Sequence, residues 1–364
     1  MNNFFKSILL FTLVVMVVSC SKSDRDSLPL RDFTAQRDTD MATIETYMHT
    51  HYIEVVNNPG ATDDQDVTFT LIPTGGTQTS IWDQTLYPLK TRMVKVRQND
   101  IDIVYKIYYL ELRQGTGVNS KSPCNVDRVL TAYKGEYIYT KTTTNTATPP
   151  VTTSAITSNQ FEESSNPQSF FNLTSVIRGW SEIFPQFKTG SYIANGDGTI
   201  SYNDFGAGVM FIPSGLAYFS GAQGGIPAYS PLIFSFKLYE VQRTDQDGDG
   251  IYSYQEDLAT SIIAADGTVS VTMGIPDGYV YVLPTGVANP DNTDDGSPIL
   301  QPDGSTKPEE VPDFLDTDDD GDFFTTASEI KNPLTGIAYP FADIPTCGGT
   351  GKKKYLDSTC HGQP

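Results

Sequence analysis

Carboxylates are the side chains of this chain whose type and spacing suggest chemistry most directly. Residues 245–256 read DQDGDGIYSYQE and match the D-x-D-x-D-G…E pattern of a calcium-binding loop. Such a loop surrounds the ion with carboxylates at positions one, three and five, a backbone carbonyl at seven and a closing glutamate at twelve. The predicted ligands are therefore Asp245, Asp247, Asp249, Ile251 and Glu256. The other interpretation is a solvated acidic turn that binds no ion.

A second acidic stretch, residues 318–329, reads DDDGDFFTTASE. Its candidate ligands are Asp318, Asp320, Asp322 and Glu329. Phe323 replaces the turn glycine of the first loop, and starting the pattern at Asp316 restores Gly321 at position six but loses the closing glutamate. Because so many carboxylates repel one another without cations, we expect Ca²⁺ to have a structural role here. No cofactor is expected for catalysis.

Composition limits the class of protein and its partners. A chain of 364 residues suggests two or three domains, and 20 Tyr with 19 Phe supply a core. The net charge of −20 argues against a nucleic-acid partner, because binding phosphates requires positive charge. The cysteines and histidines show no metal-ligand spacing, so a zinc site is not expected.

The N-terminus has the pattern of an export signal. Residues 1–20 read MNNFFKSILLFTLVVMVVSC, with Lys6 before an apolar run that is too short to span a membrane. The final VVSC resembles the lipobox of bacterial lipoproteins, which implies a signal peptide of residues 1–19 and a lipid on Cys20. An ordinary cleaved signal is the alternative. Ser21, rather than aspartate, follows Cys20, which favours the outer membrane within the cell envelope; the periplasmic and surface faces both stay open.

Export also bears on the other three cysteines. In an oxidising compartment Cys347 and Cys360 are near enough in sequence to form a disulfide that closes a small loop. Cys124 is then left over, and we expect it to be buried and inert.

The chain divides by composition into five parts: a signal (1–19), a tether (20–39), an N-terminal extension (40–104), a central domain (105–243) and an acidic C-terminal module (244–364). The extension is predicted to contain a helix over residues 40–48, with Asp40 as its N-cap and Ile44, Tyr47 and Met48 on one face. The module has short apolar runs, which suggests that something other than a large core orders it.

The central domain is predicted to be α+β. In residues 232–238 the apolar side chains of LIFSFKL recur with period two, with Ser235 and Lys237 on the opposite face. This pattern predicts a half-buried antiparallel strand. Several such strands surround one short helical segment near Trp180.

Five segments of the central domain, in order, resemble the FKBP-type peptidyl-prolyl cis-trans isomerases. They are YKG (133–135), FE (161–162), VIRGW (176–180), IPSGLAY (212–218) and IP before LIF (226–234). The resemblance implies a twisted antiparallel sheet wrapped around one short helix. It also implies a pocket between sheet and helix, with Trp180 as its floor; the alternative is that Trp180 is an ordinary core residue.

The resemblance further assigns a site, residue by residue. The implied pocket lining is Tyr133, Phe161, Val176, Ile177, Trp180, Tyr218, Ile226 and Phe234. The Ile177 N–H group and the Tyr218 hydroxyl group are expected to hold the carbonyl groups of a bound peptide. Glu162 stands where the family usually has aspartate, and Phe171 is an additional candidate.

The resemblance implies an isomerase that assists the folding of exported proteins, acting on proline-containing unfolded or flexible polypeptides. Isomerisation of an X-Pro bond needs no nucleophile, because the barrier of about 18–20 kcal/mol comes from amide resonance. The alternative is a non-catalytic, calcium-dependent binding or structural lipoprotein of the envelope on the same scaffold. Long insertions at 137–160 and 191–210, which are able to cover the pocket, favour that alternative.

Overall fold

The computed structural model describes residues 30–98, 101–256, 259–263, 269–273, 299–300, 306–307, 313–349 and 351–360. The signal peptide and Cys20 lie outside these residues. The chain divides into two units, Met1–Asp32 and Phe33–Pro364, and the description below concerns the second. None of the helices described there is both long and apolar enough to cross a membrane.

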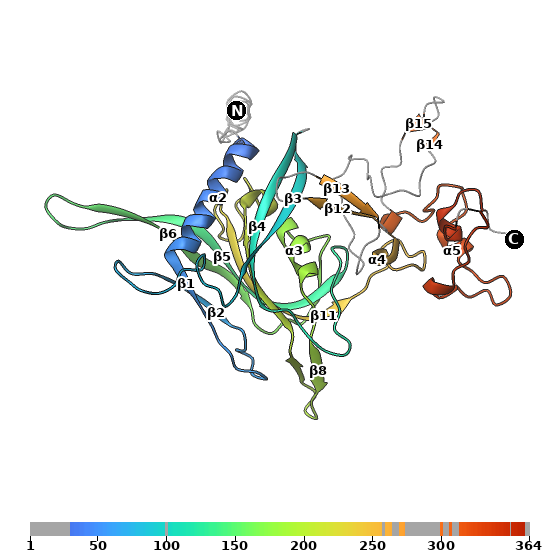
Figure 1. Cartoon of the computed structure of the whole chain (residues 1–364), viewed down its shortest axis with the longest axis horizontal. Coiled ribbons are helices and arrows are strands. Elements are labelled where there is room, and N and C mark those ends of the chain that lie inside the picture. The colour runs from blue at the N-terminus through green and yellow to red at the C-terminus, as the bar shows by residue number, and fades with distance from the viewer. Residues whose placement is uncertain are drawn as a thin grey trace, which may run out of the picture. The chain divides into compact units, whose positions relative to one another are not determined.

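An antiparallel sheet forms the body of this unit (Figure 1). Its strand order is β3-β4-β10-β11-β5-β6, with β7 paired to β5. The strands are β3 (Leu89–Gln98), β4 (Ile101–Arg113), β5 (Arg128–Thr144), β6 (Thr152–Ser164), β7 (Phe171–Asn172), β10 (Gly206–Ile212) and β11 (Leu232–Gln242). The expected α+β class with a mostly antiparallel sheet is confirmed. The hairpin of β3 and β4 belongs to this sheet, so residues 89–104 are part of it rather than a separate extension.

The short helix α3 (Arg178–Ile183) and the 3-10 turn η1 (Phe184–Gln186) pack on one face of the sheet. Met210 and Ile212 of β10 point to this face, as do alternate residues of β11 such as Phe234. The helix approaches the sheet closely because Gly179 has no side chain: a Cβ there would lie 2.6 Å from Ile212 Cδ1. The sheet and α3 therefore enclose one aromatic-rich core.

A second core lies on the opposite face of the sheet. The helix α2 (Phe33–Thr50) buries Ile44, Tyr47 and Met48 against Phe211 of β10 and Ile233 of β11. The hairpin of β1 (His51–Val55) and β2 (Val67–Leu71) covers more of this face. Residues 232–238 form the predicted antiparallel strand, but the prediction that it is only half-buried is wrong, because both of its faces are covered. Ile233 is 1% exposed, and Lys237, at 7%, is buried with its ammonium 2.6 Å from an Asp66 carboxylate oxygen.

Two N-terminal predictions need correction. Residues 33–39 belong to α2 and not to a tether, so the helix begins well before Asp40. Asp40 lies inside the helix and is not its N-cap. Its carboxylate accepts hydrogen bonds from the N–H (2.7 Å) and hydroxyl (2.6 Å) groups of Ser214, which begins the 3-10 turn η2 (Ser214–Leu216). The local sequence pattern predicted that Asp40 is an N-cap. Its actual partner, Ser214, is too distant in the sequence for a local pattern to reveal it.

The two long insertions form hairpins. Residues 137–160 extend β5 and β6 into an arm that reaches beyond the rest of the sheet (Figure 1). In the second insertion β8 (Ser191–Ala194) pairs with β9 (Ile200–Asn203). No residue of 138–160 or 191–209 belongs to the core around Trp180 or packs against it. Of the two insertions, only their end residues reach this core: Tyr137 packs against it and Met210 of β10 belongs to it, whereas the hairpin tips supply no hydrophobic side chain to it.

The C-terminal region is built from short elements. They are α4 (Ser253–Glu256), β12 (Ala259–Ile263), β13 (Val269–Met273), β14 (Ile299–Leu300), β15 (Thr306–Lys307), η3 (Asp313–Leu315), α5 (Thr326–Glu329), η4 (Phe341–Asp343) and η5 (Lys354–Leu356). Ile251, Ile330, Ile344, Tyr355 and Leu356 form a small core.

The cysteines lie as follows. Cys347 and Cys360 form a disulfide with their Cα atoms 5.9 Å apart. Cys124 is free and fully buried, as expected, and burial raises the pKa of its thiol well above the ordinary value. A thiol held in its neutral form is a poor nucleophile, which agrees with an inert role.

Candidate active site and candidate metal centre

Trp180, in the first turn of α3, lies at the centre of an aromatic cage. Its ring centroid is 5.0 Å from that of Tyr133, 5.2 Å from Phe234 and 5.5 Å from Phe171, and all three meet it edge to face. The residue is 4% exposed, and its indole N–H has no hydrogen-bond partner among the described residues. Edge-to-face packing fixes the plane of the indole, which leaves a rigid apolar surface.

The other expected lining residues surround this cage. The structure places all eight in or against one hydrophobic core: Tyr133, Phe161, Val176, Ile177, Trp180, Tyr218, Ile226 and Phe234. Phe161, Val176, Ile177 and Tyr218 are half-buried, so they form the rim, whereas the others are buried. Phe171, held more loosely from the sequence, also packs here.

The rim carries few polar groups. Ile177 precedes α3 with extended backbone angles, and no intramolecular hydrogen bond is recorded for its N–H group within the described chain. The Tyr218 hydroxyl group likewise has no recorded partner there. Glu162 is exposed on β6 opposite Gly135 of β5. These two unengaged groups lie beside the apolar cluster around Trp180 and are available to a ligand with carbonyl groups.

The carboxylate of Glu162 acts on both tyrosines of the site. Burial, and after it the negative charge of Glu162, raises the pKa of Tyr133 well above its ordinary value. The same two causes, in the same order, raise the pKa of Tyr218. Both hydroxyl groups therefore stay protonated at neutral pH and are able to donate hydrogen bonds.

The loop that carries Tyr218 is held from the opposite side by α2. Besides the two hydrogen bonds from Ser214 to Asp40, the ring of Phe33 stacks on that of Phe219 with centroids 4.5 Å apart. Local sequence patterns do not reveal these contacts, because they join distant segments. The N-terminal helix therefore supports the rim of the pocket.

Helix α3 is fixed to the sheet by a buried ion-pair network. Glu182, with its side chain 1% exposed, pairs with Arg92 of β3 at 3.0 Å and with Arg178, one turn earlier on α3, at 2.6 Å. Breaking a buried pair by removing one partner typically costs about 3–5 kcal/mol, because a charge is then left uncompensated. The network thus fixes the orientation of the helix that carries Trp180.

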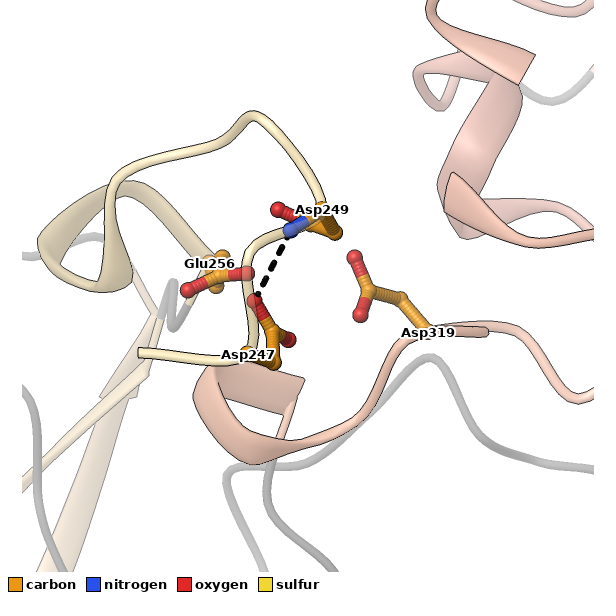
Figure 2. Close-up of side chains that lie close together, drawn as sticks. All are labelled: Asp247, Asp249, Glu256 and Asp319. Atoms are coloured by element: carbon orange, nitrogen blue, oxygen red, sulfur yellow. Dashed lines mark hydrogen bonds between the residues drawn. The ribbon is translucent and has the colours of Figure 1, made fainter. Parts of the chain in front are cut away.

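A separate cluster of carboxylates forms the candidate metal centre (Figure 2). Asp247, Asp249, Glu256 and Asp319 each offer one oxygen, and these oxygens lie within 4.8 Å of one another. Asp245, an expected ligand, is outside this group: its oxygens accept hydrogen bonds from the N–H groups of Gly248 (2.7 Å) and Gly250 (3.2 Å). Asp245 therefore shapes the turn.

Ile251, expected to offer its carbonyl group, has a buried side chain in the small C-terminal core, and its N–H group donates to Asp249 Oδ1 at 2.7 Å.

The second acidic stretch brings Asp318, Asp320 and Asp322 together in the same way. Phe323 adopts a left-handed backbone angle (φ 74°) with an exposed side chain, so it takes the conformation usually reserved for glycine. Glu329 closes this stretch. Burial, followed by the charge of Asp320, raises its pKa to about 8.

Crowding of buried carboxylates shows in their titration. Burial first, and then Asp319, raises the pKa of Glu256 to about 11. Burial first, and then Asp313, raises the pKa of Asp319 to about 10. A cation among these groups would reverse both effects, because opposite charge favours the ionised form. The sequence missed Asp319, since the loop pattern assigns only its neighbours as ligands.

Comparisons with known proteins concern parts of the chain. Residues 246–354 match the protein-family model described as BamM C-terminal. No curated protein matches the chain. Among solved structures, a peptidyl-prolyl cis-trans isomerase from Pseudomonas syringae pv. tomato is 27% identical and matches over 38% of this chain and 76% of its own, with a TM-score of 0.25.

FkpA from Escherichia coli is 24% identical over 37% of this chain and 48% of its own, also with a TM-score of 0.25. At such TM-scores neither likeness supports a function, which depends instead on the pocket residues.

Proposed function

We propose that the chain is a peptidyl-prolyl cis-trans isomerase that acts on exported, unfolded or flexible polypeptides. The observation that carries this proposal is the cage around Trp180, whose rim bears the unengaged Ile177 N–H and Tyr218 hydroxyl groups. The cage offers the proline ring a flat apolar surface, and the two rim groups bind the flanking carbonyl groups. No nucleophile or acid–base pair is required.

The pocket favours the transition state because it excludes water. Water stabilises the planar amide through its polarised carbonyl group, and a dry aromatic cage removes that stabilisation. The twisted amide is less polar and loses less on entering, so the pocket binds it preferentially. Uncatalysed isomerisation takes tens to hundreds of seconds, so a few kcal/mol of differential binding gives useful acceleration.

We further propose that the protein works in the cell envelope, attached by a lipid on Cys20 with the outer membrane as its preferred location. The sequence VVSC followed by Ser21 supports the anchor. The match of residues 246–354 to the BamM C-terminal family supports an envelope or outer-membrane context and an association with the assembly of outer-membrane proteins.

A second candidate function is non-catalytic binding in the same compartment. That family match favours it, because a C-terminal region with a role of its own would need the isomerase domain only as a scaffold. The position of the two insertion hairpins favours catalysis instead, since none of residues 138–160 or 191–209 is among the hydrophobic residues of the core around Trp180.

The deciding experiment is protease-free isomerisation of a Leu-Pro peptide, followed by NMR exchange. Tyr218→Phe removes one hydrogen bond, worth about 1 kcal/mol, and is expected to lower kcat/KM about fivefold. Trp180→Ala should lower it further. Trp82→Ala, on the opposite face of the sheet, and Tyr192→Phe, on the β8 hairpin, are matched controls expected to keep activity. No catalysis by folded wild-type protein would leave the binding function.

A further inference from the structure

The four carboxylates of the first cluster come from two separate segments. Asp247, Asp249 and Glu256 belong to the loop and short helix that follow β11, whereas Asp319 belongs to the segment between η3 and α5. Figure 2 shows the four side chains directed toward one another. Glu256 is 0% exposed, Asp319 is 1% and Asp249 is 4%. The cluster is therefore an interior feature and not a solvated acidic surface.

Their oxygens divide into two kinds. Asp247 Oδ1 accepts the N–H of Asp249 at 3.3 Å, and Asp249 Oδ1 accepts that of Ile251 at 2.7 Å. The other oxygen of each aspartate has no hydrogen-bond partner, and neither has any carboxylate oxygen of Glu256 or of Asp319 in the described chain. One set of oxygens thus holds the loop in shape, and the other set is left for a ligand.

Burying several carboxylates without partners is strongly unfavourable, since each loses its hydration and repels the others. A bound cation would neutralise these carboxylates. Because all of the donor atoms are oxygens, the site favours a hard divalent cation. Calcium suits a site assembled from two separate segments, because it accepts six to eight oxygens in irregular geometry, whereas magnesium demands a near-ideal octahedron.

We propose that Asp319 completes a calcium site with Asp247, Asp249 and Glu256, so that one ion joins two segments of the chain. The residues on either side of Asp319 point elsewhere: Asp318 and Asp320 gather with Asp322 in the second cluster. In the triplet Asp318–Asp320, the middle aspartate therefore belongs to the first cluster and the outer two belong to the second.

Apolar contacts support the same joining of segments. Ile251 of the first loop packs with Ile330, which directly follows the closing Glu329 of the second stretch. Phe314 of η3 is 2% exposed and packs against Cys124 and Val126, which precede β5. The ion therefore fastens residues 313–330 to the end of the isomerase-like domain at a place where their apolar surfaces already fit. This inference does not depend on isomerase activity.

The test is calcium binding by the purified full chain in detergent, after chelation, measured by titration calorimetry. Asp319→Asn is expected to weaken one ion at least tenfold and to leave a second ion unchanged. Asp318→Asn should weaken the other ion. Asp343→Asn, which removes the same charge from an exposed position in the same region, should match wild type.

Hydrogen exchange identifies the ion that is lost. In wild type, calcium should slow exchange in peptides covering both 245–256 and 313–322, and chelation should release them together. In Asp319→Asn with calcium, the 245–256 peptides should lose this protection although none of their residues is changed, whereas the 313–322 peptides keep the part that the second ion gives. If Asp319→Asn binds like Asp343→Asn, or if chelation of wild type changes only one of the two peptide sets, the shared site is refuted. If the variant does not fold, the wild-type comparison still refutes the shared site when chelation changes only one of the two peptide sets.

Discussion

Asp40 gives the sharpest test of how the N-terminal helix supports the pocket. Its carboxylate accepts both the N–H and the hydroxyl group of Ser214, which is 0% exposed. Hydrogen bonds to a charged group contribute about 1.5–3 kcal/mol, and a buried polar group without a partner costs about 1–3 kcal/mol. Because these effects overlap, Asp40→Ala is expected to lower the free energy of unfolding by about 3 kcal/mol. Ser214 also accepts the N–H groups of Ala217 and Phe219, on either side of Tyr218, so its displacement should move the Tyr218 hydroxyl group.

Urea unfolding measures the loss in the free energy of unfolding. The effect on Tyr218 is measured as kcat/KM for a Leu-Pro peptide, under conditions where the variant is fully folded. The matched control is Asp38→Ala on the same helix, since Asp38 has a 66% exposed side chain and pairs with Arg37 at the surface. Exposed pairs contribute about 0.2–1 kcal/mol. If Asp40→Ala and Asp38→Ala lose the same stability, the supporting role of Asp40 is wrong. If stability falls but kcat/KM in the folded variant does not, the link to Tyr218 is wrong.

Three further predictions concern the pocket wall, titration and the disulfide. Gly135→Ala should lower both stability, by about 1–3 kcal/mol, and peptide turnover, because its Cβ would lie 2.5 Å from Phe161 Cζ; urea unfolding and the peptide assay measure these. In chelator, the protection of the C-terminal region from hydrogen exchange, relative to an unstructured peptide at the same pH, should fall as the pH rises between about 4.5 and 11. The raised pKa of Glu256 gives stability that is complete below the lower value and is lost toward the upper one; protection that stays constant or rises with pH would contradict this. With calcium the trend should vanish. Cys347→Ser removes the disulfide to Cys360, which spans a separation of 13 residues. The free energy of local unfolding of the C-terminal region, measured by hydrogen exchange, should fall by about 3 kcal/mol. An unchanged exchange rate would count against this prediction.

Sequence alone predicts those features that depend on neighbouring residues. The pocket segment VIRGW is contiguous, so the family resemblance that it carries places Trp180 at the start of a short helix without any long-range information. Asp40 is different: its partner lies 174 residues further along, and a capping pattern was the only local explanation.

The same limit explains the error over β11 and the omission of Asp319. Period two in LIFSFKL identified one buried face, but the covering of the other face by α2 is a long-range event. Asp319 is surrounded by aspartates that satisfy a loop pattern without it. Only the approach of residues 247–256 in space reveals that its side chain belongs to the other cluster.

The pairing of α2 with late strands has a consequence for how the chain folds. The first helix of the unit, α2, packs its apolar side against β10 and β11. These contacts stabilise the helix only after both strands have formed. Such contacts give the domain a high contact order, and chains of that kind fold slowly because long loops must close before any contact stabilises them. During synthesis the apolar face of α2 emerges first, and roughly two hundred further residues must follow before β11 can cover it. A protein proposed to help others fold therefore exposes, during its own folding, the kind of surface on which a chaperone acts.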